Sequence, residues 1–133
     1  MIDASTLIEA EKGRLDVASK IRGREDEEFF ISVVTASELL QGVWRTRLKD
    51  SQTRAKRSAF VEGILDRFPI LPIDLTTARI HAQLWAGLES KGFSIVVHDN
   101  WLAATCIGHS LNLITSNVKD FKKVPGLKIE VWS

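Results

Sequence analysis

The sequence has few features that would cross-link the chain or anchor it in a membrane. Cys106 is the single cysteine, so no disulfide can form within the chain, which favours an intracellular location. No apolar run approaches the roughly 20 residues of a membrane-spanning helix, and the start of the sequence lacks a basic segment followed by an apolar one. We therefore expect a cytoplasmic protein with no membrane segment.

The sequence also has no excess of one charge. Its 18 Lys and Arg residues nearly balance 17 Asp and Glu residues, so any attraction to nucleic acid or membranes must be local. A glycine-rich nucleotide loop of the form G-x-G-x-x-G or G-K-[ST] is absent, and no His and Cys spacing indicates zinc. A candidate functional site therefore has to be sought among residues other than a glycine-rich loop or a His and Cys cluster.

The sequence does have a regular alternation of strand and helix patterns. Apolar segments predict buried strands at 29–34, 69–73 and 111–116, and an alternating segment predicts a sheet edge at 127–132. Helical spacing covers 6–12, 15–22, 35–48, 52–68, 76–91 and 100–109. This order predicts a mainly parallel sheet with helices on both faces and ligands at the carboxyl ends of the strands. With no repeat or low-complexity linker, we expect a single domain over 1–133.

The first strand raises a question of its own. Asp3 follows only Met1 and Ile2, whereas a strand usually has about five residues. Either this strand is very short, or the sequence begins inside a longer natural chain.

Four acidic residues stand where an apolar segment gives way to a helix or turn. Asp3 follows Met1 and Ile2, Glu38 follows the segment 29–34, Asp99 follows "SIVV", and Asp120 lies just beyond 111–116. In a parallel sheet these carboxyl ends meet at one edge, so the four acids can share a pocket. Crowded carboxylates repel each other unless a cation lies between them, which makes a hard divalent ion such as Mg²⁺ or Mn²⁺ a natural ligand.

Each acid also has an ordinary structural interpretation. Thr35 and Glu38 form the T-x-x-E pattern of a capping box, and Asp99 precedes a helical segment that it could cap. Asp120 could cap a turn or pair with a neighbouring lysine. Asp3 is harder to explain in this way, because a charge at the end of an inner strand is costly without partners.

The motifs taken together resemble a known family. A D-x-S start, "ISVVTASELLQGV" with Glu38, "VVHDNWLAATC" with Asp99 and "LITSNVKDFKKVPGLKIE" with Asp120 follow one another in the order found in PIN-domain ribonucleases, specifically the VapC toxins of toxin–antitoxin pairs. The resemblance covers nearly the whole chain. Departures are Ala4 in place of the usual Thr, Trp101 in place of an aliphatic residue, and Asn117 where some relatives carry an acid. The last departure leaves Asp120 as the fourth acid.

The resemblance implies a three-layer α/β/α sandwich with a central mainly parallel sheet, and a homodimer. It implies RNA cleavage that depends on Mg²⁺ or Mn²⁺ and uses Asp3, Glu38, Asp99 and Asp120. It also implies a cognate VapB-type antitoxin, whose peptide tail occupies the groove beside the acids. We expect Asp3 and Asp99 to hold the main ion, with Glu38 and Asp120 assisting.

Other polar residues are candidates for support around the acids. Ser5, Thr115 and Asn117 could orient the carboxylates by hydrogen bonds, although their types fit turns equally well. The segment 44–57 contains six Lys and Arg residues, among which Arg45 and Arg47 are candidates to contact RNA or the antitoxin. The alternative for these cations is the solvated face of a helix pair.

Two other functions fit parts of the pattern. The first is a non-catalytic partner-binding domain that keeps the fold and uses its acids as helix caps. The second is a phosphotransfer receiver, which also gathers acids at strand ends. A receiver needs a lysine after its last strand, and only Trp132 and Ser133 stand there.

Overall fold

The structure is a computed structural model that describes residues 1–46 and 51–133. Its helices are α1 (Ala4–Glu11), α2 (Val17–Ile21), α3 (Val33–Thr46), α4 (Ser51–Arg67), α5 (Leu75–Ser90), α6 (Val97–Gly108) and α7 (Val118–Phe121). Its strands are β1 (Ile31–Ser32), β2 (Ile70–Leu71), β3 (Leu113–Ile114) and β4 (Ile129–Glu130). Within the described residues, no helix is long and apolar enough to span a bilayer.

The first three residues join two strand pairs into one parallel arrangement. β1 pairs with β2 and β3 pairs with β4, each in parallel. The Ile2 N–H donates to the Phe30 carbonyl at 2.9 Å on one side, and the Asp3 N–H donates to the Ile114 carbonyl at 2.9 Å on the other. The order across the sheet is therefore β2, β1, residues 1–3, β3 and β4. The predicted parallel sheet is confirmed, and its central strand is very short.

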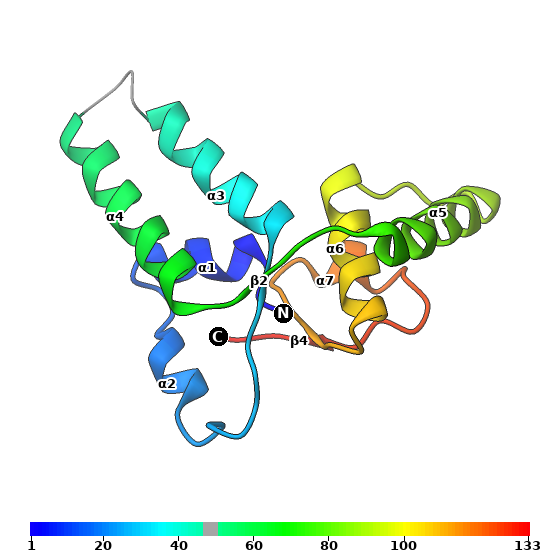
Figure 1. Ribbon diagram of the computed structural model, residues 1–133, viewed down its shortest axis with the longest axis horizontal. Helices are drawn as coiled ribbons and strands as arrows, with labels where there is room; N and C mark the ends of the chain where they lie inside the picture. The colour runs from blue at the N-terminus through cyan, green and yellow to red at the C-terminus, as the bar shows by residue number, and fades with distance from the viewer. Residues whose placement is uncertain (47–50) are drawn as a thin grey trace.

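Alternate residues of the central strands face two separate cores. Ile2 and Ile114 belong to a core with residues of α1 to α4, whereas Met1 and Leu113 belong to a core with residues of α6 and α7. This division follows from the two-residue period of a strand, which turns successive side chains to opposite faces. Figure 1 shows the same division, with α1 to α4 on one side of the strands and α5 to α7 on the other. The predicted three-layer α/β/α arrangement is confirmed.

The boundaries of several elements differ from the sequence prediction. The strand predicted at 29–34 ends at Ser32, because α3 begins at Val33 and the Ser32 hydroxyl accepts a hydrogen bond from the Val34 N–H at 3.1 Å. The "SIVV" segment is not a strand, and Val97 already belongs to α6. The short helix α7, which contains Asp120, was not predicted. Residues 47 and 48 of the helix predicted at 35–48 lie outside the described residues.

Two paired isoleucines provide a test of this layering. Ile31 in β1 is fully buried, whereas its partner across the parallel pair, Ile70 in β2, is 37% exposed. We expect Ile31→Ala to lower the free energy of unfolding by about 2–5 kcal/mol, because it leaves a cavity in the core. Ile70→Ala should cost less than about half of that, because part of its side chain is already in water. Urea unfolding followed by circular dichroism measures both losses, and equal losses would contradict the layering.

Candidate active site

Asp3 is the most buried of the four predicted acids. It ends the central strand, is only 5% exposed, and occupies the N-cap position of α1 without a side-chain cap hydrogen bond within the described residues. Instead, its Oδ2 atom accepts hydrogen bonds from Ser5 Oγ at 2.9 Å and Thr115 Oγ1 at 2.6 Å. Thr115 Oγ1 in turn accepts from the Asn117 N–H at 3.0 Å. These contacts compensate part of the cost of burial and fix the direction of the carboxylate.

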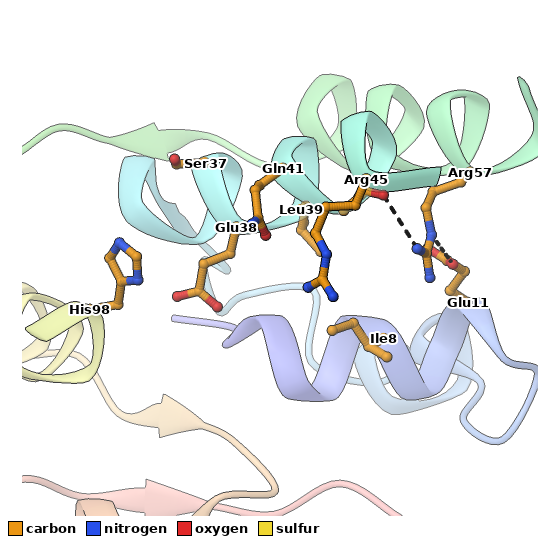
Figure 2. A pocket seen from close by; sticks show the side chains of 10 residues that line it. Ile8, Glu11, Ser37, Glu38, Leu39, Gln41, Arg45, Arg57 and His98 are labelled. Carbon is orange, nitrogen blue, oxygen red and sulfur yellow. Dashed lines mark hydrogen bonds and ion pairs between the residues drawn. The ribbon is translucent and has the colours of Figure 1, made fainter. Parts of the chain in front are cut away.

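Glu38 points from α3 into the neighbouring pocket, as Figure 2 shows. The capping box proposed for Thr35 and Glu38 is wrong, because α3 begins two residues before Thr35. The Thr35 hydroxyl is buried, and no hydrogen-bond partner for it is found in the described part of the chain. Glu38 is therefore half-buried for a reason other than capping.

Asp99 lies in the first turn of α6 and does not cap that helix. The N-cap position belongs to Val96, and the described residues contain no side-chain cap for α6. The carboxylate of Asp99 accepts a hydrogen bond from Asn117 Nδ2 at 3.4 Å. Thus Asn117, which was predicted as an orienting residue, contacts one acid through its side chain and is linked to Asp3 through Thr115.

Asp120 lies at the edge of this group. It is in α7, where Lys123 Nζ approaches its Oδ1 atom at 3.7 Å, so the expected lysine pair is present. The pair is partly exposed and contributes little to stability. Asp120 nevertheless acts on the site through its charge, because it raises the pKa of Asp99.

Electrostatic coupling links the four acids. Burial raises the pKa of Asp99 to about 6, with further contributions from the charges of Asp3 and Asp120. Burial also raises the pKa of Glu38, with further contributions from Asp3 and Asp99. His98 lowers the pKa of both, so it lies near them as well. The structure therefore brings the predicted acids into one electrostatic site, and their repulsion is only partly relieved by neighbouring groups.

The donor chemistry of this site fits a hard divalent cation. Its ligand atoms would be carboxylate oxygens, which Mg²⁺ and Mn²⁺ prefer, and a cation would offset the repulsion that adds to the effect of burial on the pKa values of Glu38 and Asp99. In residues 1–46 and 51–133, no three His, Cys, Asp or Glu side chains are close enough together to form a complete ligand set. The fold thus brings the acids near enough for their charges to interact, but in the described residues their side chains do not meet around a single point.

A pocket of about 610 Å³ extends along α3 from Glu38, and its described lining does not include Asp3, Asp99 or Asp120. Residues of α1, α3 and α4 and His98 line it, and Figure 2 shows Glu38 and His98 at one end, Arg45 farther along and Arg57 at the other end. Arg57 is held by Glu11 Oε1 at 2.8 Å and by Thr46 Oγ1 at 3.2 Å. Arg47, the second predicted contact residue, lies outside the described residues.

Sequence reasoning missed two members of this pocket. His98 was not among the predicted site residues, yet it lines the pocket and its charge lowers the pKa of Glu38 and of Asp99. Its position next to Asp99 in the sequence was the available signal. Arg57 was treated as one of several solvated cations. Its contact with Glu11 joins residues 46 positions apart, which no local pattern could indicate.

Comparison with known proteins gives a consistent result. Residues 1–127 match the PIN domain family. The chain is 31% identical to "Ribonuclease VapC" of Rickettsia bellii, over 97% of this chain and 92% of that protein, and 29% identical to "tRNA(fMet)-specific endonuclease VapC" of Salmonella typhimurium, over 99% and 96%. Among solved structures, DNA-bound VapBC from Salmonella typhimurium is similar with a TM-score of 0.87 and 27% identity, over 100% of this chain and 97% of that one.

The charge repulsion at Asp99 leads to a prediction about stability. We expect Asp99→Asn to raise the free energy of unfolding by about 1–2 kcal/mol in EDTA at about pH 7.5, a value discounted for solvent screening. Because the pKa of Asp99 is raised from 3.8 to about 6, the folded protein holds this proton more tightly than the unfolded chain. Parent stability therefore falls as pH rises through that range, and the advantage of the variant should vanish below about pH 4.

Urea unfolding at several pH values measures this difference. Asp26→Asn, which removes an exposed acid from a turn, is the matched control and should change nothing. A loss of stability in Asp99→Asn above pH 6 would mean that the charge of Asp99 stabilises the fold, which is the opposite of mutual repulsion among the acids.

Proposed function

The chain belongs to the PIN domain family and to its VapC group, and we propose that it is a metal-dependent endoribonuclease that acts as the toxin of a type II toxin–antitoxin pair. The observation that carries this proposal is the set of electrostatically coupled carboxylates at one edge of the parallel sheet. The ion is Mg²⁺ or Mn²⁺, the substrate is RNA, and residues 1–133 act as one domain in the cytoplasm.

The acids have different positions and therefore different proposed roles. Asp3 and Asp99 hold the main ion, because both are partly or fully buried and each is oriented by hydrogen bonds. Glu38 and Asp120 assist directly, through water, or at a second ion. A bound divalent cation supplies an acidified water and neutralises charge on the phosphoryl group.

The supporting residues act on the acids rather than on RNA. Ser5 and Thr115 both donate to Oδ2 of Asp3, so they fix one oxygen and orient the other. Asn117 donates to Asp99 and limits its rotation. Such hydrogen bonds to ligand carboxylates set the geometry of metal sites and affect their affinity.

The proposed partner is a VapB-type antitoxin. The similar solved structures include VapBC complexes, and the pocket along α3 offers a groove beside Glu38 that a peptide tail could cover. A bound peptide there would keep RNA away from the carboxylates. The toxin would then be inactive until the antitoxin is removed.

The alternative is a non-catalytic domain that binds a partner and uses its acids as caps. This alternative has less support, because neither Glu38 nor Asp99 caps its helix. Carboxylates that destabilise the chain without capping it need another role. Metal-assisted hydrolysis gives them one.

Cleavage assays test the proposal directly. We expect the purified protein to cleave RNA with Mg²⁺ or Mn²⁺ and to stop in EDTA. Asp99→Asn should lower the rate by at least about 100-fold, the size of loss that follows removal of one electrostatic contact to a transition state. Asp26→Asn is the control and should cleave normally. An Asp99→Asn protein that cuts RNA as fast as its parent would refute the assignment.

Exposed apolar residues support the proposed homodimer. Leu75 and Trp85 of α5 and Val97 of α6 are between 55% and 67% exposed, and α5 packs against α6, so these side chains are available to a second copy of the chain. We expect sedimentation velocity to give twice the chain mass of 14.9 kDa. A single species at the chain mass, at concentrations well above micromolar, would contradict the dimer.

A further inference from the structure

Arg45 shares a helix face with Glu38. The two residues are seven positions apart on α3, which is about two turns and about 10 Å along the helix axis. Both line the same pocket, and Figure 2 shows the Arg45 guanidinium pointing into the space between α3 and α1. The pocket therefore has an acidic end at Glu38 and a cation farther along the same wall.

The charge of Arg45 is not compensated within the described part of the chain. No ion pair or hydrogen bond joins its side chain to another described residue, whereas Arg57 in the same pocket is paired with Glu11 Oε1 at 2.8 Å. Arg57 also donates to the Gly42 carbonyl at 3.4 Å. Arg57 thus holds α4 to α1 and α3, and Arg45 presents a guanidinium that is available to a ligand.

An anion is the ligand that this arrangement fits. A guanidinium binds a phosphate through two parallel hydrogen bonds, and it remains charged at any physiological pH. RNA that reaches the acids is repelled by them, so the positive charge of Arg45 on the same pocket wall offsets part of that repulsion. Glu38 and Arg45 line the same pocket, so an RNA backbone that passes Glu38 can also reach Arg45.

Resting on the ribonuclease function proposed above, we propose that Arg45 is a positioning residue that binds a backbone phosphate of the RNA substrate near, but not at, the cleaved bond. The contact fixes the register of the strand relative to Asp99 and Glu38. Phosphate contacts of this kind position a nucleic acid without reading its sequence. A carboxylate of an antitoxin peptide is the competing ligand, and the experiment separates the two.

The test measures RNA binding in the Asp99→Asn background, so that the RNA stays intact. A fluorescein-labelled single-stranded RNA of mixed sequence is titrated in Mg²⁺ at several KCl concentrations, and fluorescence anisotropy gives the Kd. Arg45→Ala should weaken binding about tenfold and reduce the salt dependence, the slope of log K against log[KCl], by about 0.7, the value for one phosphate of a single strand. Arg45→Lys should restore the slope and only part of the affinity.

Arg79→Ala is the matched control, because Arg79 lies on α5 in the opposite layer. It should change the Kd less than twofold and leave the slope unchanged. Replacing single phosphates of the RNA by neutral methylphosphonates localises the contact. The methylphosphonate at one position should weaken RNA binding by the protein that has Arg45, and it should not change RNA binding by the Arg45→Ala protein.

Each outcome decides the proposal. An unchanged Kd and slope in Arg45→Ala would overturn the proposal, and this is the result expected if Arg45 contacts only an antitoxin carboxylate. An equal effect of Arg79→Ala would also overturn it. So would the finding that no single methylphosphonate weakens binding to the Arg45 protein alone. Cleavage kinetics of the Arg45→Ala protein with an intact Asp99 should show a raised KM and a kcat within about threefold of the parent. If the parent protein does not cleave RNA, the ribonuclease proposal fails, and the binding data still decide whether Arg45 contacts an RNA phosphate.

Discussion

The repulsion between carboxylates at the end of the central strand is the interaction on which the site depends. Asp3 cannot move away from it, because its backbone is bonded into the sheet and two hydroxyls hold Oδ2 of its side chain. Asp99 approaches from α6, and its pKa rises to about 6 as a result of burial and of its acidic neighbours. The fold therefore keeps an arrangement that costs it stability, which is typical of residues retained for function.

Local sequence patterns predicted the fold well where one rule was sufficient. The alternation of apolar segments and helical spacing indicated the parallel sheet and its two helical layers, because buried parallel strands leave continuous apolar runs. The element boundaries followed tertiary context instead. Val33 and Val97 favour strands by type, yet both begin helices, and Ser32 ends β1 by accepting a hydrogen bond from the Val34 N–H.

The candidate site was predictable only in part. Asp3 and Ser5 are neighbours in sequence, but the contact between Thr115 and Asp3 joins residues 112 positions apart and depends on the order of the strands. The same limit applies to Arg57 and Glu11. Capping was a reasonable alternative for Glu38 and Asp99, and it failed because both helices begin earlier than their sequence patterns indicate. Two residues of α3 give the pocket opposite charges at different places: Glu38 lies at the end near His98, and Arg45 lies farther along the helix.

The central claim is that these acids repel one another until a divalent cation binds among them. Carbon-13 NMR titration of the Asp99 carboxyl group tests this claim most directly, because it reports the protonation of one residue without any assay of activity. Burial together with the charges of Asp3 and Asp120 predicts a pKa of about 6 for Asp99 in metal-free buffer, and a cation bound among the acids predicts a value well below that after Mg²⁺ is added. A pKa near the ordinary 3.8 that does not respond to Mg²⁺ would contradict the claim.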